Sequence, residues 1–271
     1  MTLAGIPLRG VSLAGRETWF HVPSLDLAFD VGRAPAEVVP APHLFLSHAH
    51  LDHAGGLAYW VSQRRLLRLP PARVFTDPAA VPTWRQILAL HAQLEGVGYD
   101  VEVEGLAPGG SVDLRRDLSV CAFRADHRVP ALGFVASEVR RRLVPSWQGR
   151  PEEEIRAAIL RGEEAPRRSP RPLVAFSGDT GTGLFESAPR EAFEAKVFLL
   201  ECSFVETQDL PRARNYGHMH LEDLAERADL FANEVLVLTH LTLRGTPSEL
   251  RSAIARRLPA SLASRTVPFL P

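Results

Sequence analysis

The chain has 271 residues, 45% of them hydrophobic, which fits one large domain or two small ones with a well-buried core. It carries 31 lysines and arginines against 32 aspartates and glutamates, giving a formal charge of −1. This balance excludes the overall positive field of a general nucleic-acid binder, so an anionic substrate would need a local positive site.

The first half of the chain shows a strand meander followed by alternating strands and helices. Over 8–30, short apolar runs are broken by glycine and proline, as in successive hairpin strands. An apolar strand is expected over 43–47, and the apolar spacing over 52–69 predicts a helix after it. The next expected elements are strands near Val74, Val101, Val112 and Val120 and a helix over 79–94.

Residues 138–172 differ from the rest in composition. The segment holds nine arginines and five prolines against six glutamates. We expect it to leave the core as an excursion containing a short amphipathic helix over 151–160, with Pro151 in the first helical position. Its modest positive charge allows two interpretations, a solvated loop or a surface that contacts RNA.

The last third of the chain alternates strands and helices. Apolar runs over 173–176, 197–200 and 235–238 predict strands buried on both faces. Helices are expected over 221–232 and 247–257. Hairpin strands followed by strand–helix alternation predict a layered α/β domain.

The cysteines and the apolar runs bear on location. Cys121 and Cys202 lie far apart among apolar neighbours and are expected to be reduced core thiols, as in a cytoplasmic protein. Residues 1–15 do not have the pattern of a signal peptide, and the chain has no apolar stretch of 18 residues. We therefore expect neither export nor a membrane span.

An HxHxDH block follows the strand over 43–47 and contains His48, His50, Asp52 and His53. Alternate residues at a strand end point the same way, so the first two histidines can bind one metal ion while the following turn directs the other pair to a second. The alternative is a polar turn with Asp52 near a helix N-terminus. That interpretation explains one carboxylate but not three imidazoles.

Further candidate ligands follow three other expected strands: Asp126 with His127, Asp179, and His240. Each residue alone would more often be structural. Ligands in open α/β sheets gather at the carboxyl ends of strands, and all these residues stand at such ends. We therefore expect them to share one site with the HxHxDH block.

These blocks, together with LLECSF over 199–204 and YGHMHLEDL over 216–224, resemble the metallo-β-lactamase superfamily. Within it, the chain is most similar to the short-form tRNase Z group, especially its plant-type members, and the likeness spans nearly the whole chain. The resemblance implies a single α/β domain over 1–271, built as a metallo-β-lactamase αβ/βα four-layer sandwich with two facing mixed sheets and helices outside.

The resemblance also implies a metal centre of two Zn²⁺ ions, for which Mn²⁺ or Fe are alternatives. The implied ligands are His48, His50 and His127 for the first ion, Asp52, His53 and His240 for the second, and Asp179 between them.

The implied reaction is phosphodiester hydrolysis by a hydroxide that bridges the two metal ions. Asp52 would hold the proton of this nucleophile. His220, oriented by Glu201, is the expected donor of a proton to the departing 3′ oxygen, and His218 is the alternative donor.

For the substrate, the resemblance implies precursor tRNA, cut to leave a 3′ hydroxyl on the tRNA and a 5′ phosphate on the trailer. Arg140, Arg141 and Arg142 are the expected RNA contacts, in a short equivalent of the arm with which this group grips tRNA. A homodimer is implied as well, because members of the group commonly form one.

Two alternative functions stay open. The first is a hydrolase of the same fold that acts on a small phosphodiester, thioester or lactone. The second is a non-catalytic RNA-binding protein or scaffold. The complete ligand set argues against the second, because a retired site has no physical need for so many converging polar groups.

Overall fold

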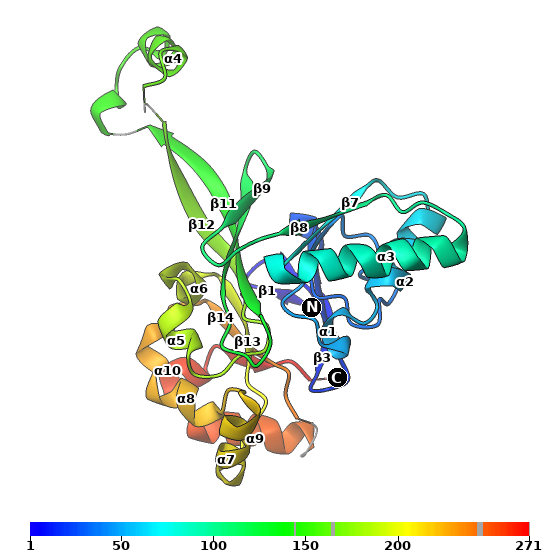
Figure 1. The fold of residues 1–271 in the computed structure, drawn as a ribbon. Coiled ribbons are helices and arrows are strands. Elements are labelled where there is room, and N and C mark those ends of the chain that lie inside the picture. Colours follow the sequence, from blue (N-terminus) through cyan, green and yellow to red (C-terminus); the bar gives the residue numbers. More distant parts are fainter. Residues whose placement is uncertain (144, 164–165, 243–245, 271) are drawn as a thin grey trace.

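A computed structural model shows two facing β-sheets with helices on both outer sides (Figure 1). It describes residues 1–143, 145–163, 166–242 and 246–270, with the side chains of all of them except 141–143 and 166–168. The first sheet follows a two-stranded hairpin of β1 (Thr2–Leu3) and β2 (Ile6–Pro7). Its six strands are, in spatial order, β3 (Arg9–Leu13), β4 (Glu17–Val22), β5 (Leu27–Phe29), β6 (His43–Phe45), β7 (Ala72–Thr76) and β8 (Val101–Gly105).

The second sheet has seven strands and mixes antiparallel with parallel pairing. In spatial order they are β15 (Thr266–Pro268), β14 (Val235–Thr239), β13 (Val197–Glu201), β12 (Pro166–Phe176), β11 (Leu132–Leu143), β10 (Leu118–Arg124) and β9 (Ser111–Arg115). β10 and β12 are each antiparallel to β11, while β12, β13 and β14 are parallel. The strands β10, β12, β13 and β14 therefore end at the same edge of the sheet.

The central core lies between the two sheets and is rich in phenylalanine. Phe29 and Phe45 of the first sheet pack against Phe134 and Phe176 of the second, with ring centroids 5.2–6.1 Å apart. These side chains are fully or almost fully buried, so their contacts hold the two sheets face to face.

Helices cover the outer face of each sheet. Two helices pack on the six-stranded sheet through Trp60 and Trp84. They are α2 (Leu57–Leu66) and α3 (Val81–Glu95). The helices on the seven-stranded sheet are α5 (Leu184–Ser187), α6 (Arg190–Glu194), α8 (Leu221–Glu226), α9 (Pro247–Arg257) and α10 (Ala260–Ala263). The four-layer αβ/βα sandwich expected from the sequence is thus confirmed.

The helix expected over 52–69 is instead two helices, α1 (Leu51–Ala54) and α2, which are separated by Gly55 and Gly56. At Gly56 the chain passes so close to another loop that an added Cβ would lie 2.6 Å from the backbone nitrogen of Ala34. The helix expected over 221–232 ends at Glu226 and continues as a 3₁₀ turn over Ala228–Leu230. The helix expected over 247–257 is found with these bounds.

The described residues of 138–172 form a two-stranded arm instead of a loop (Figure 1). β11 and β12 run beyond the sheet as an antiparallel ribbon, and α4 (Glu152–Leu160) lies at its tip. The expected helix is therefore present, with Pro151 as its N-cap rather than its first residue. Within the described residues, every helix is too short or too polar to cross a membrane.

Candidate metal centre

The HxHxDH block lies at the turn between β6 and α1. The buried carboxylate of Asp30 fixes this turn through hydrogen bonds. The Asp30 carboxylate accepts hydrogen bonds from the backbone N–H and the hydroxyl of Ser47, both at 2.7 Å, and from His53 Nδ1 at 2.7 Å. Because the Ser47 hydroxyl donates to Asp30, it is left to accept from His48 Nδ1 at 3.0 Å. Because Nδ1 of His48 and of His53 is hydrogen-bonded in this way, both rings point Nε2 into the same space.

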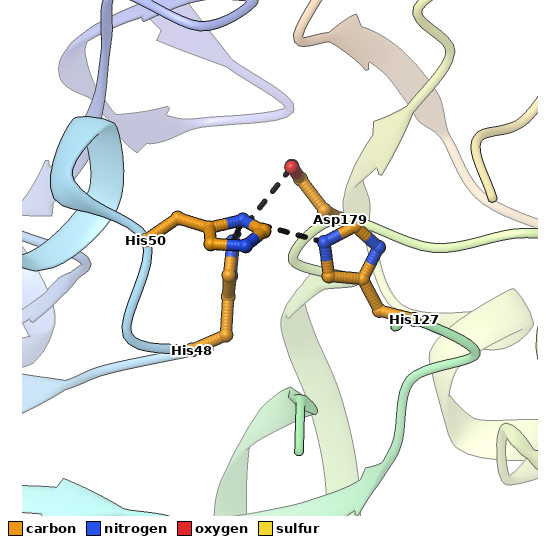
Figure 2. A group of neighbouring side chains, drawn as sticks. All are labelled: His48, His50, His127 and Asp179. Atoms are coloured by element: carbon orange, nitrogen blue, oxygen red, sulfur yellow. Dashed lines mark hydrogen bonds and ion pairs between the residues drawn. The ribbon is translucent and has the colours of Figure 1, made fainter. Parts of the chain in front are cut away.

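Four side chains converge in the first candidate ligand group, which Figure 2 shows. Donor atoms of His48, His50, His127 and Asp179 all lie within 4.8 Å of one another. His48 Nε2 and His50 Nδ1 are 2.9 Å apart, and His127 Nε2 is 3.5 Å from the same His50 atom. Lone pairs this close repel each other unless a proton or a metal ion lies among them.

The second candidate ligand group consists of Asp52, His53 and His240. Asp52 Oδ2 lies 3.7 Å from His53 Nε2 and 3.6 Å from His240 Nε2. Asp179 lies between the two groups, with Oδ1 3.3 Å from His53 Nε2 and Oδ2 3.8 Å from His48 Nε2. Asp179 is therefore close enough to both groups to be a candidate shared ligand.

The protonation states of these side chains suit a divalent cation. Burial lowers the pKa of His48 well below its usual value, and burial also lowers the pKa of His127, so both rings are neutral donors near neutral pH. Burial opposes ionisation of Asp52 and Asp179. The neighbouring histidines nevertheless lower the pKa of Asp52 to about 2 and hold that of Asp179 well below its usual range. Neutral imidazoles with ionised carboxylates are the donor set that such cations bind.

The unpartnered atoms point to the same ligand. Burial opposes charge on His53, but Asp179 and Asp30 together raise its pKa well above the usual value, which shows how strongly this cluster attracts positive charge. The Nε2 atoms of His53 and His240 are buried and have no hydrogen-bond partner among the described residues. A buried polar atom without a partner is costly, and metal coordination would satisfy both atoms.

His240 is held by two serines, one in the first strand of the six-stranded sheet and one just after β13. Its backbone adopts a left-handed conformation with φ of 56°, which is strained for a residue other than glycine. Its backbone N–H donates to Ser12 Oγ of β3 at 2.8 Å, and its Nδ1 lies 2.8 Å from Ser203 Oγ. These contacts fix both the backbone and the ring, so that Nε2 faces Asp179 at 3.4 Å.

The structure contradicts the expected role of His220. This residue is fully buried as the N-cap of α8. Its Nδ1 accepts from the backbone N–H of Glu222 at 3.1 Å, and its Nε2 therefore donates to the carbonyl oxygen of Glu206 at 2.9 Å. Both ring nitrogens are thus committed to the backbone. The sequence-based assignment was wrong because a histidine directly before a helix can cap that helix instead of donating a proton, and the sequence motif does not distinguish the two roles.

His218, the alternative, lies at the candidate centre. Its ring is 5.5 Å from the His127 ring and 5.3 Å from the His240 ring, measured between centroids. Glu201 faces His218 instead of His220, with Oε1 3.3 Å from Nδ1. Burial opposes charge on His218, but this carboxylate raises its pKa. The carboxylate of Glu201 also accepts from the backbone N–H groups of Ser203 and Met219, which fixes its orientation.

Other residues singled out in the sequence lie elsewhere. Asp126 accepts a hydrogen bond from the Gly183 backbone at 2.8 Å and thereby ties together the two loops that carry His127 and Asp179. Arg140 forms an ion pair with Glu138 at 2.9 Å on the arm. In the register of the two strands, Arg140 stands opposite Ser169, which is seven residues before the end of β12. Arg140 is therefore roughly 23 Å along the strand from the end that carries the metal centre. The side chains of Arg141 and Arg142 lie outside the described residues.

Sequence analysis missed the positioning residues Asp30, Ser12, Ser47 and Ser203. Asp30 had a signal, because it stands directly after the apolar run LAF over 27–29, which forms a strand. Ser12 had none, because it is 228 residues away from the histidine that it holds.

The family model that matches the chain, over residues 20–241, is described as a beta-lactamase superfamily domain. The chain is 32% identical to tRNase Z TRZ1 of Arabidopsis thaliana over 267 residues, which cover 98% of this chain and 95% of that protein. It is 29% identical to ribonuclease Z of Bradyrhizobium diazoefficiens, over 80% of this chain and 78% of that protein.

Among solved structures, the fold is similar to that of human tRNase Z, short form (ELAC1). The TM-score is 0.61 and the identity is 18%, with 88% of this chain and 93% of that chain covered.

Proposed function

Because the chain belongs to the β-lactamase superfamily, and within it to the tRNase Z family, we propose that it is a metal-dependent endoribonuclease that removes 3′ trailers from precursor tRNA. The observation that carries this proposal is the convergence of two ligand groups on Asp179 in a chain that matches a tRNase Z over nearly its full length. The products would be a tRNA with a 3′ hydroxyl and a trailer with a 5′ phosphate.

Two Zn²⁺ ions are the proposed cofactor, with Mn²⁺ or Fe as the alternatives that metal analysis would reveal. His48, His50 and His127 would hold one ion, and Asp52, His53 and His240 the other, with Asp179 shared. When bound, such ions polarise the phosphodiester and lower the pKa of the attacking water.

The protein residues would supply positioning and proton transfer. Asp52 stays ionised and partly accessible, with 17% of its side chain exposed, so it can accept a hydrogen bond from the attacking water and orient it. His218 would donate a proton from Nε2 to the departing 3′ oxygen. Its contact with Glu201 favours the protonated ring that a general acid needs, and 16% of its side chain is exposed to an incoming substrate.

The arm is the proposed second contact with RNA. The three arginines of the arm, Arg140, Arg141 and Arg142, lie on β11 far from the metal centre. They would therefore bind a remote part of the tRNA and affect its binding more than the chemical step. Replacing all three with alanine should raise KM for precursor tRNA and leave metal content unchanged. Unchanged turnover of precursor tRNA would favour the solvated-arm interpretation.

We also propose a homodimer in the cytoplasm. The support for the dimer is the exposure of large apolar side chains on α1 and α3, where Leu51, Leu90 and Leu94 are 79%, 54% and 83% exposed. The support for the location is that Cys121 and Cys202 are both free thiols. Analytical ultracentrifugation tests the dimer, and a single species of about 30 kDa would contradict it.

The deciding experiment incubates the metal-loaded protein with precursor tRNA that carries a 3′ trailer and, separately, with bis(p-nitrophenyl) phosphate. Cleavage of both, with the RNA cut at the trailer junction, supports the proposal. Cleavage of only the small ester favours a small-molecule hydrolase. Cleavage of neither by protein with stoichiometric metal would leave hydrolysis of a thioester or lactone, or a non-catalytic role.

A further inference from the structure

Two arginines flank an exposed tyrosine beside the candidate proton donor. Arg128 directly follows His127 in the chain. Arg212 and Tyr216 belong to α7 (Leu210–Tyr216), which ends two residues before His218. The guanidinium carbons lie 5.6 Å and 5.8 Å from the centre of the Tyr216 ring. We call these three residues the Arg–Tyr–Arg cluster.

The backbone places this cluster at the edge of the metal centre. Gly217 has a φ of 72° and ends α7 in a left-handed turn, which directs the next residue, His218, toward the His127 ring at 5.5 Å. The Arg128 side chain passes over this turn, since a Cβ added to Gly217 would lie 3.8 Å from Arg128 Cγ. The cluster therefore borders the centre on the side of His218.

The charges of the cluster are available to a ligand. Neither Arg128 nor Arg212 pairs with a carboxylate in the part of the chain that the structure describes, and both are exposed. Arg214 on the same helix differs, because both of its terminal nitrogens bind Asp223. Guanidinium groups held by an aromatic ring are well suited to bind phosphate oxygens, and in a chain of net charge −1 they form a local positive site.

We propose that the Arg–Tyr–Arg cluster binds the backbone phosphate on the 5′ side of the last nucleotide that the tRNA keeps. This inference rests on the proposed function. In an in-line displacement, the attacking and leaving oxygens lie on opposite sides of phosphorus. His218 would protonate the leaving 3′ oxygen, so the nucleotide attached to that oxygen lies on the side of His218, where the cluster stands. Tyr216 acts as a positioning residue for the two guanidinium groups.

The first test is the double variant Arg128→Ala/Arg212→Ala, assayed on precursor tRNA and on bis(p-nitrophenyl) phosphate. Loss of charged hydrogen bonds to a phosphate should lower kcat/KM for the RNA roughly 10- to 100-fold, mainly through KM. The loss for the small ester should be at least tenfold smaller. The plot of log kcat/KM against log salt concentration should become shallower by about 0.7 for each lost phosphate contact.

The matched control is Arg68→Ala, which removes an exposed arginine just after α2 and outside the cluster. It should match the wild type on both substrates. Tyr216→Phe should keep the RNA activity because the ring is retained, whereas Tyr216→Ala should lose part of it. Equal losses in both tyrosine variants would overturn the positioning role.

A second test identifies the phosphate that is bound. Precursor tRNA is prepared with a neutral methylphosphonate either 5′ of the last retained nucleotide or one nucleotide into the trailer. The first replacement should slow the wild type and have no further effect on the double variant, while the trailer replacement should affect both enzymes equally. Equal sensitivity of both enzymes to the first replacement would overturn the assignment.

The outcomes also separate this inference from the proposed function. A metal-loaded wild type that does not cut the precursor overturns both. A wild type that cuts it at the trailer junction, together with a double variant that behaves like Arg68→Ala, overturns only the phosphate subsite.

Discussion

His218 and His220 are two residues apart, but their surroundings assign them different tasks. His218 faces Glu201 and two candidate ligands, whereas His220 is bonded to the backbone through both nitrogens. We expect His218→Ala to retain metal and to slow precursor cleavage about 10²- to 10⁴-fold, because the leaving oxygen loses its proton donor. Single-turnover kinetics with metal analysis of the same sample measures both quantities.

His220→Ala is the matched control for this prediction. Loss of the N-cap, of the bond to Glu206 and of a buried ring should lower the free energy of unfolding by about 2–5 kcal/mol and leave the single-turnover rate of the folded protein near that of the wild type. The reverse pattern, with slow chemistry in the His220 variant and normal chemistry in the His218 variant, would return the donor role to His220.

Ser203 should control metal affinity without being a ligand. Its hydroxyl is 2.8 Å from His240 Nδ1 and fixes the ring that presents Nε2 to Asp179. Ser203→Ala is expected to weaken metal binding about 10- to 100-fold, which is the usual effect of removing such a partner. Competition with a chelator measures this change. Ser62→Ala removes a hydroxyl that bonds Glu95 on the surface and should leave the affinity unchanged.

At the scale of elements, the sequence predicts best where one physical cause dominates. The apolar runs that became β12, β13 and β14 are buried on both faces, and the chemistry follows directly after their ends. β11 was missed because its outer half leaves the sheet, where charged residues such as the exposed Arg140 replace the apolar pattern of a buried strand. The prolines at 170 and 172 also argued against a strand, yet a ribbon that leaves the sheet tolerates them.

The turn between α1 and α2 depends on a close backbone approach that no periodicity reveals. Gly56→Ala would place a Cβ 2.6 Å from the Ala34 nitrogen, so the two loops must separate. We expect a loss of about 1–3 kcal/mol in the free energy of unfolding. Denaturant titration should show this loss, whereas Gly98→Ala, where an added Cβ meets no atom within 4 Å, should change stability by only a few tenths of a kcal/mol. Equal effects of the two substitutions would show that the contact with Ala34 is unimportant.

For the whole molecule, the proposed ligands come from both sheets. His48 to His53 follow β6 of the first sheet, while His127, Asp179 and His240 follow strands of the second. The residue types of the site were predictable because metal binding restricts them to histidine and carboxylate. Their supports, such as Ser12 under His240, were not, because serine serves many purposes and the contact forms only when the sheets meet.

Bound metal should therefore stabilise the packing of one sheet on the other. If the free concentration of the metal ion is 100 times its Kd, each bound ion adds about 2.7 kcal/mol to the free energy of unfolding. For a chain of this size that corresponds to roughly 5–10 °C in Tm per ion. Calorimetry before and after dialysis against EDTA measures the shift, and restored Zn²⁺ should reverse it. An unchanged Tm in protein shown to lose its metal would contradict ligation from both sheets.

The hydrogen bond between Ser12 and His240 also orders events during synthesis. The two residues are separated by 228 positions, so Ser12 is synthesised long before the histidine that it holds. Until His240 has been synthesised, the hydroxyl of Ser12 in β3 has no backbone N–H of His240 to accept from, and the candidate ligand groups lack this histidine. The candidate ligand set is therefore complete only once the segment that carries His240 docks against β3.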